Sequence, residues 1–276
     1  NPDAGKVLLN LLDEKKIQLV SIMDHTPGQG QYRDIESYIR FAMKWRKEKM
    51  GMDVTEEEMY ENVRIAQERP KAWDTVRAVG KITTEEDVPL ASHDDDTPEK
   101  VAMVNDMGAT ISEFPVTVEA AKAAREREMY TVMGAPNALR GASHSGNLSA
   151  ADAVAEGLVD ILAADYYPSA LLQSIYSLQE RNILPVAQGI KLISENPAKA
   201  LRLEDRGRID PGMFADITLV EESQRPRVRA TIRNGVPIYW DGHMARLDGS
   251  SLDGGIHSGA EAESSMMAQV EERIAS

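Results

Sequence analysis

Residues that can bind a metal ion or transfer a proton stand directly after short apolar runs of this sequence. His25, His93 and Asp165 each occupy such a position. If the apolar runs are parallel strands, their carboxyl ends meet at one edge and bring the three side chains together. Two imidazoles and a carboxylate form a ligand set that zinc and similar divalent ions accept. The sequence therefore predicts a metal site made of His25, His93 and Asp165.

Asp165 has a second predicted role in the same site. A carboxylate beside a metal site can accept the proton of an attacking water and return it to the leaving group, so Asp165 is also the candidate catalytic residue. Simpler interpretations stay open. A lone histidine is more often a structural hydrogen-bonding group, and Asp165 precedes Pro168, where it can also cap a helix.

Three aspartates, Asp94, Asp95 and Asp96, follow His93 directly. One of them is expected to cap a helix that begins at Pro98, because Asp is a good capping residue and proline is favoured in the first turn. The other two are expected to orient His93 from outside the ligand set.

A polar loop at residues 134–147 combines glycines with a fixed positive charge and several hydrogen-bonding groups. Such a combination suits a multiply charged phosphate ester. A solvent-exposed turn that leads into a helix would have a similar composition, so both interpretations stay open. The candidate substrate-binding residues of this loop are Asn137, Arg140, Ser143, His144 and Asn147.

Short apolar runs alternate with helical patterns as far as about residue 165. The runs predict five strands, at 17–23, 88–92, 109–112, 130–133 and 159–164. The intervening segments predict helices at 4–15, 35–49, 55–79, 98–107, 118–128 and 150–157. Strands separated by helices of this length form parallel βα units, which build an open doubly wound sheet or a TIM-type (β/α)₈ barrel.

The polar residues at the strand ends favour the barrel over the open sheet. Barrel enzymes place their chemistry at the carboxyl ends of several strands, whereas open sheets bind ligands mainly at one switch point with glycine-rich phosphate turns. Neither a G-x-G-x-x-G nor a P-loop sequence occurs here. Five units cannot close an eight-strand barrel, so we expect an α/β fold with a partial TIM-type barrel.

The pattern changes near residue 200. Short strands joined by turn residues are predicted from 216 to 240, and Asn234-Gly235 is a strong hairpin signal. Beyond residue 247 the chain is rich in Gly, Ser, Ala and Glu. The predicted domains are a partial (β/α) barrel at 1–200, a small β-sandwich annex at 201–247 and a flexible tail at 248–276.

The composition excludes several classes of protein. The 276 residues include 45 acidic and 31 basic side chains, for a net charge of −14, and no cysteine. The lack of cysteine excludes disulfides, thiolate zinc sites and thiol nucleophiles. The acidic total argues against nucleic acid as a partner, and no run approaches the about 20 apolar residues of a membrane helix. The N-terminal residues resemble no signal peptide, so a cytoplasmic location is predicted.

Two segments near the change of pattern resemble the closing signature of the amidohydrolase superfamily, where a helix leaves the barrel and enters the small β-sandwich. They are Glu195-Asn196-Pro197-Ala198-Lys199-Ala200-Leu201 and residues 206–216. Within this superfamily, further segments are similar to the PhnM-type phosphonate-metabolism hydrolases, at 23–29, 92–97, 112–115, 134–137 and 140–147. The resemblance extends over about residues 1–247.

This resemblance implies hydrolysis of α-D-ribose 1-methylphosphonate 5-triphosphate to the 5-phosphate and diphosphate. It implies a divalent metal cofactor, zinc first with iron or manganese as alternatives, bound by the two histidines and the aspartate named above. The partner would be this small phosphorylated substrate. The residues that would face its triphosphate are Arg140, Ser143, His144 and Asn147.

The sequence departs from the superfamily pattern at its start. The superfamily opens with a His-x-His motif on its first strand, after part of the β-sandwich, and this chain has neither. The predicted strands would then be the last five of eight. We expect either a fragment of a longer reading frame or a homo-oligomer whose copies complete each other's fold, because unpaired strand edges are unfavourable.

Two other functions stay open at this point. The closing signature does not select a substrate, so an amidohydrolase that cleaves a cyclic amide or deaminates a nucleobase is one alternative. The missing opening motif also fits a truncated, catalytically silent scaffold. Metal content and a substrate panel separate these alternatives.

Overall fold

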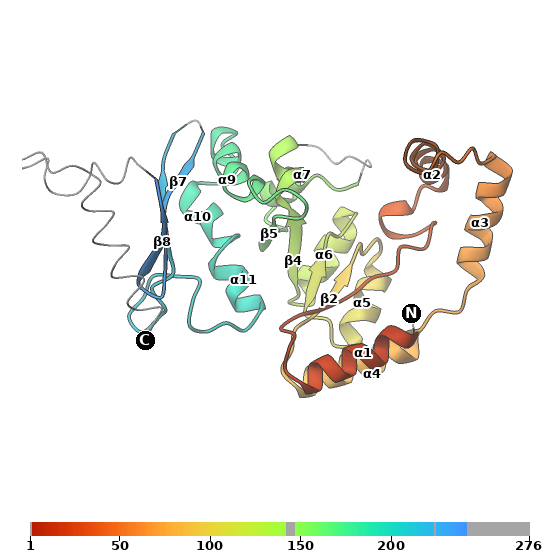
Figure 1. Cartoon of the computed structure of the whole chain (residues 1–276), viewed down its shortest axis with the longest axis horizontal. Helices are drawn as coiled ribbons and strands as arrows, with labels where there is room; N and C mark the ends of the chain where they lie inside the picture. Colours follow the sequence, from red (N-terminus) through yellow and green to blue (C-terminus); the bar gives the residue numbers. More distant parts are fainter. Residues whose placement is uncertain (1, 142–146, 224, 242–276) are drawn as a thin grey trace, which may run out of the picture. The chain divides into compact units, whose positions relative to one another are not determined.

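The computed structural model (Figure 1) describes residues 2–141, 147–223 and 225–241. Ser143, His144 and the predicted tail at 248–276 lie outside the described residues. The chain divides into two compact units, Asn1–Arg208 and Ile209–Ser276.

A five-stranded sheet forms the centre of the first unit. Its strands lie in the order β1-β2-β3-β4-β5, and each neighbouring pair is parallel. This arrangement confirms the predicted α/β fold with a partial barrel. The strands are β1 (Val20–Ile22), β2 (Leu90–His93), β3 (Ile111–Glu113), β4 (Tyr130–Gly134) and β5 (Ile161–Ala163).

Helices connect these strands along the chain, as the colours of Figure 1 show. Most of them overlap the helices expected from the sequence pattern. The helices are α1 (Pro2–Asp13), α2 (Ile35–Met50), α3 (Glu56–Glu68), α4 (Trp73–Glu85), α5 (Pro98–Asp106), α6 (Val118–Glu126), α7 (Ala135–Arg140), α8 (Ala150–Ala155), α9 (Ala170–Glu180), α10 (Val186–Lys191) and α11 (Glu195–Ala200), with a 3-10 turn, η1 (Gly30–Tyr32).

The predicted helix at 55–79 is two helices, α3 and α4. Pro70 cannot continue a helix and disfavours a helical backbone at the residue before it. Arg69 accordingly has φ −63° and ψ 133°, an extended conformation. The prediction of one continuous helix is wrong because of this proline. The break creates a short linker, residues 69–72, that carries two basic side chains.

Residues 135–140 form a short helix, α7, where the sequence analysis expected a loop. Pro136 lies in the first turn of this helix. N–H groups in the first turn have no acceptor within the helix, so the missing N–H of proline costs no hydrogen bond there. Gly141 ends the helix in the left-handed conformation, with φ 76°. Asn137 and Arg140 therefore belong to a helix that follows β4 directly.

A hydroxyl group caps three of the helices that follow the strands. The caps of α5, α6 and α8 are Thr97, Thr117 and Ser149. The prediction that one of Asp94–Asp96 caps the helix at Pro98 is wrong, because the adjacent threonine occupies the capping position. Asp165 is not the N-cap of α9 either, since Ser169 holds that position.

Apolar side chains of the first strands and helices form one core cluster of this unit. It contains Leu12, Val20, Val79, Leu90, Val101 and Val104. Beside this cluster, Gly80 allows a close approach of α4 to the turn after α5. A Cβ atom added at Gly80 would lie 1.8 Å from the backbone carbonyl oxygen of Met107. Only a glycine at this position allows α4 to pack so closely against the turn after α5.

The second unit, where described, is an antiparallel sheet with the strand order β6-β7-β8. Its strands are β6 (Ile217–Glu221), β7 (Arg227–Arg233) and β8 (Val236–Trp240). Asn234 and Gly235 form the hairpin between β7 and β8 with φ values of 51° and 77°, as the sequence signal predicted. Arg229 is paired with Glu221 and Asp241.

Among the helices of the described residues, none is both long enough and apolar enough to cross a membrane.

Candidate metal centre

His25, His93 and Asp94 meet at the carboxyl ends of β1 and β2. One possible ligand atom from each lies within 4.8 Å of the other two. The Nε2 atom of His25 is 3.5 Å from Oδ2 of Asp94, and Nε2 of His93 is 3.7 Å from Oδ1 of the same carboxylate. The structure thus brings together both predicted histidines with an aspartate that the sequence analysis had not chosen as a ligand.

The backbone of Asp94 explains why this aspartate faces the histidines. Asp94 adopts the left-handed conformation, with φ 52°, directly after β2. Its N–H donates to the carbonyl oxygen of Glu113 at 2.9 Å. The chain therefore turns at Asp94 and does not continue the alternation of a strand, so consecutive residues His93 and Asp94 reach the same place. This positive φ is not visible in the sequence pattern.

Glu113 orients His93. The Nδ1 atom of His93 lies 2.9 Å from the Glu113 carboxylate, which also accepts from the Ser21 hydroxyl at 3.1 Å. Burial opposes ionisation of Glu113, but the hydrogen bond and the positive charge of His93 outweigh it and lower the pKa of Glu113. An ionised carboxylate can only accept, so it keeps the proton on Nδ1 and leaves Nε2 available to a metal ion.

The pKa of His93 is raised, because the effects that favour its charged form outweigh the effect of burial. Burial opposes the charged imidazolium, whereas the hydrogen bond to Glu113 and the charge of Asp94 favour it more strongly. For Asp94, burial disfavours the charged carboxylate and raises the pKa, although the charges of the two histidines oppose this shift.

The three side chains fit a divalent metal ion. Asp94 is 4% exposed, and its Oδ2 atom has no hydrogen-bond partner among the described residues. A buried carboxylate oxygen without a partner is costly unless a cation satisfies it. Two imidazole nitrogens and one carboxylate oxygen are a ligand set that zinc, iron and manganese accept.

A buried network supports the turn at His93 and Asp94 from below. Lys100 Nζ donates to the carbonyl oxygens of both residues, at 3.2 and 3.0 Å, and lies 3.9 Å from Oδ1 of Asp95. Asp95 is fully buried and accepts from the hydroxyls of Ser92 and Ser112 at 2.5 and 2.6 Å. Lys100 was not predicted as part of the site, because a lysine in the first turn of a helix carries no signal of its own.

Asp95 and Asp96 do not orient His93, so that prediction is wrong. Asp95 belongs to the buried network, and Asp96 accepts the backbone N–H of Gly30 at 2.7 Å. Asp96 thereby fixes the loop that carries His25 against the turn after β2. The hydrogen-bonding partner of His93 comes from the neighbouring strand β3, at Glu113, because parallel strands place their last residues side by side.

Asp165 lies outside the three-residue group and lines a cavity of about 250 Å³ next to it. The same cavity is lined by Asp94, Asn137, Arg140, Asn147 and Tyr166. Asp165 also follows its strand in the left-handed conformation, with φ 53°. Within the described residues, three of the predicted substrate-binding residues thus line one cavity with the predicted catalytic aspartate.

The contacts of Asn137 and Arg140 within this cavity differ. The Asn137 amide donates to the Leu148 carbonyl at 3.2 Å and accepts the Ala150 N–H at 3.0 Å. It therefore holds the backbone that leads into α8. Arg140 donates to the hydroxyl of Tyr166 at 2.5 Å and has no ion-pair partner among the described residues.

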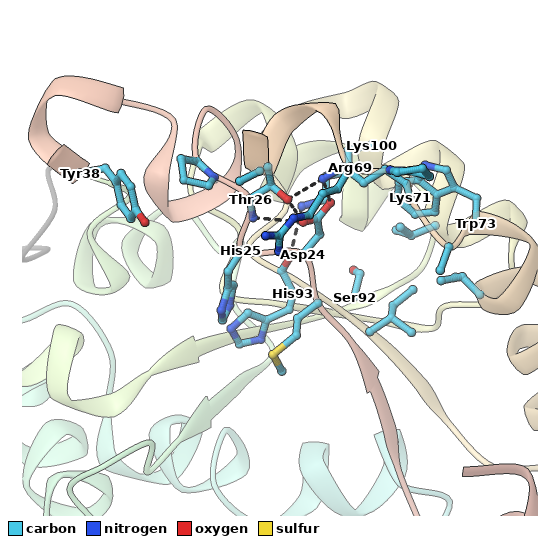
Figure 2. Close-up of a pocket in the computed structure, with 18 residues that line it drawn as sticks. Asp24, His25, Thr26, Tyr38, Arg69, Lys71, Trp73, Ser92, His93 and Lys100 are labelled. Atoms are coloured by element: carbon cyan, nitrogen blue, oxygen red, sulfur yellow. Dashed lines mark hydrogen bonds and ion pairs between the residues drawn. The ribbon is translucent and has the colours of Figure 1, made fainter. Parts of the chain in front are cut away.

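A larger cavity, of about 760 Å³, lies on the side of His25 and His93 (Figure 2). Asp24 and Thr26 line it together with Lys71 of the linker. Lys71 Nζ is 2.6 Å from Oδ2 of Asp24 and 2.5 Å from the Thr26 hydroxyl. Burial opposes ionisation of Asp24, but the hydrogen bonds from Lys71 and Thr26 outweigh it and hold its pKa well below the usual range. Lys71 carries no signal in the sequence that marks it as a residue of this site.

The model of the amidohydrolase family matches residues 63–239, more than half of the chain. The chain belongs to the amidohydrolase family.

A curated relative agrees with the finer resemblance seen in the sequence. The chain is 38% identical over 211 residues to the alpha-D-ribose 1-methylphosphonate 5-triphosphate diphosphatase of Escherichia coli (strain K12). The match covers 76% of this chain and 55% of the relative, so the chain spans little more than half of the relative's length. The predicted resemblance to phosphonate-metabolism hydrolases is thereby confirmed.

Solved structures share the fold at low sequence identity. The dihydropyrimidinase from Brevibacillus agri NCHU1002 superposes with a TM-score of 0.51 and 11% identity, covering 87% of this chain and 67% of that chain. An uncharacterised protein superposes with a TM-score of 0.50 and 16% identity, covering 61% and 49%. At these identities the likeness shows the fold alone.

Proposed function

We propose that the chain carries the site of a metal-dependent hydrolase that cleaves a phosphoric anhydride bond of a ribose phosphonate triphosphate and releases diphosphate. The observation that carries this proposal is the group His25, His93 and Asp94, with its unpartnered buried oxygen. The name of the E. coli relative supplies the substrate. Because the chain spans 55% of that relative, both the substrate and the reaction are proposals.

The two imidazoles and the Asp94 carboxylate would hold the metal ion. Zinc is our first choice, with iron and manganese next, because a set of nitrogen and oxygen ligands accepts each of them. A divalent ion bound there would supply positive charge against the negative charge that develops on the phosphate oxygens. Glu113 fixes the tautomer of His93 that this requires.

We assign the proton transfer to Asp165. Its carboxylate lines the smaller cavity together with Asp94, where it can accept the proton of the attacking water and return it to the departing diphosphate oxygen. Asp165 was also predicted from the sequence as a metal ligand. Since Asp94 is the carboxylate grouped with the histidines, we propose Asp94 as the ligand and keep Asp165 for the proton.

Arg140 would bind the triphosphate in the same cavity. A guanidinium offers paired N–H donors that match two phosphate oxygens, and Arg140 lies beside Asp94, Asn147 and Asp165. Asn137 would act indirectly, because its amide is bonded to the backbone of residues 148 and 150.

Elemental analysis of His25→Ala and His93→Ala tests the proposed metal site. We expect the wild-type chain to carry a divalent ion and both variants to lose most of it. His93→Ala also removes the partner of Glu113, so His25→Ala, whose side chain is 42% exposed, is the variant that changes folding least. Unchanged metal content in both would reassign the histidines to packing.

A substrate panel tests the reaction. Release of diphosphate from ribose 1-methylphosphonate 5-triphosphate is measured beside ring opening of a dihydropyrimidine, with the metal-loaded chain in both assays. We expect the first activity and not the second. Ring opening alone would favour an amidohydrolase acting on a cyclic amide, and a chain that binds metal without either activity would favour a silent scaffold.

A further inference from the structure

We propose that Arg69 forms a second anion-binding subsite, in the larger cavity, which binds the phosphonate end of the substrate while Arg140 binds the triphosphate end in the smaller cavity. This inference rests on the proposed function. Beyond that function, the inference gives the orientation of the substrate in the site. It also gives the class of compound that the site accepts, which is an ester with a negatively charged group at each end.

The larger cavity has a local excess of positive charge. Arg69, Lys71 and Lys100 line it, and Asp24 is its one carboxylate among the described lining residues. The chain as a whole carries a net charge of −14. A cavity with this charge balance in an acidic protein favours an anionic ligand, and its volume of about 760 Å³ lies in the range of small-molecule sites.

Arg69 is the cation of this cavity that remains available to a ligand. Lys71 is bound to Asp24 and Thr26, and Lys100 to the carbonyl oxygens of residues 93 and 94. Arg69 makes no hydrogen bond or ion pair with any residue that the structure describes. Its guanidinium therefore offers N–H donors in a planar fork, which suits two oxygens of a phosphonate.

The linker that carries Arg69 is tied to the loop that carries His25. Gln67 at the end of α3 donates to the Pro27 carbonyl at 2.9 Å, and Lys71 binds Asp24 and Thr26 on the same loop. Figure 2 shows Arg69 and Lys71 on the side of the cavity where Asp24 and Thr26 lie. The backbone at Arg69 is thus held beside the loop of His25 before any ligand binds, so the linker needs no rearrangement to present the Arg69 side chain to the cavity.

The candidate metal centre faces both cavities. His25 and His93 line the larger cavity, and Asp94 lines the smaller one. A substrate centred there can extend one end into each. Asp165 and Arg140 share the smaller cavity, so the anhydride that is cleaved belongs there, and the phosphonate at the other end of the ribose belongs beside Arg69.

Titration calorimetry with two matched probes tests the proposal without turnover. The probes are ribose 1-methylphosphonate 5-phosphate and ribose 5-phosphate, which lack an anhydride and differ in the phosphonate. The full chain is used with Zn²⁺ present. We expect the wild type to prefer the phosphonate probe, and Arg69→Ala to weaken its binding about tenfold or more, as loss of a charged hydrogen-bonding partner does, while binding of ribose 5-phosphate stays unchanged.

Three further variants complete the test. Arg64→Ala, on the preceding helix α3 and paired with Glu61 and Glu68 outside the cavity, should leave both affinities unchanged. Arg69→Lys should recover part of the loss, because it keeps the charge and loses the fork. Diphosphate serves as a third probe, for the smaller cavity. Arg140→Ala should weaken the binding of diphosphate, and Arg69→Ala should leave it unchanged.

Two results would overturn the assignment in distinguishable ways. If Arg69→Ala binds both ribose probes like the wild type while Arg140→Ala loses diphosphate, the subsite is refuted and the proposed function stands. If the metal-loaded wild type binds neither the ribose probes nor diphosphate, the proposed function fails and the subsite fails with it. Thermal unfolding of each variant checks that the fold is retained.

Discussion

The two candidate imidazole ligands are held by different means. His93 stands on a buried turn at the end of β2, where Glu113 fixes its ring and Lys100 holds the backbone on both sides of the turn. His25 stands on a loop, its side chain is 42% exposed, and the loop is fixed by partners from α3 and the linker at 69–72. One ligand is therefore fixed by the core and the other by a peripheral helix pair.

This difference separates stability from metal affinity. A substitution in the buried network that supports the turn at His93 removes buried polar partners and should lower the free energy of unfolding. A change beside His25 removes partly exposed contacts, so it should lower metal affinity and leave the fold in place. Four variants test this distinction, from the largest expected effect to the smallest.

Asp95→Ala should have the largest effect. It removes the carboxylate that accepts from the buried hydroxyls of Ser92 and Ser112 and that lies 3.9 Å from the Lys100 ammonium. Removal of one partner of a buried charged group costs about 3–5 kcal/mol. Urea unfolding of the metal-free chain measures this. Asp106→Ala, whose side chain is 75% exposed, is the control. A loss below about 1 kcal/mol would show that the network does not support the turn.

Glu113→Ala should mainly lower metal affinity. Loss of the carboxylate frees the His93 ring and removes the group that keeps the proton on Nδ1, an effect of about 10- to 100-fold for partners of metal ligands. Zinc affinity is measured by competition with a chelating dye. Glu113→Gln, which keeps an acceptor oxygen, should lose less. Equal affinities of all three proteins would contradict the role of Glu113.

Lys71→Ala should lower zinc affinity by several-fold, at the lower end of that range. It releases Asp24 and Thr26 next to His25, but the pair is partly exposed, so the free energy of unfolding should fall by only about 1 kcal/mol. Lys16→Ala, an exposed lysine near Glu14, is the matched control. A loss of stability as large as that of Asp95→Ala would remove the distinction between the two supports.

Gln67→Ala should have the smallest effect, because it removes one neutral hydrogen bond to Pro27, worth about 0.5–1.5 kcal/mol. We expect a small decrease in zinc affinity and an additive effect with Asp95→Ala, since the two belong to separate supports. A double variant that differs from the sum of the single variants by more than about 1 kcal/mol would show that the supports are coupled.

Local patterns in the sequence predicted most of the fold. The five parallel strands, the hairpin at Asn234-Gly235 and the position of His25 and His93 after strands depend on hydrophobic period and turn residues, which are properties of neighbours in the chain. The errors also have local causes. Pro70 divided a predicted helix, and Thr97 took the capping position expected for an aspartate. Cytoplasmic location and self-association stay predictions.

The sequence by itself determined the elements, their order and two histidines at neighbouring strand ends, because these depend on residues close together in the chain. Tertiary structure alone decided which carboxylate joins them. The left-handed turn at Asp94 brings it to the histidines, whereas Asp165 lines the adjacent cavity. It also decided the supports: Lys71 meets Asp24 across 47 residues, and Glu113 meets His93 across 20. Such contacts arise from packing, and no periodicity or spacing in the sequence records them.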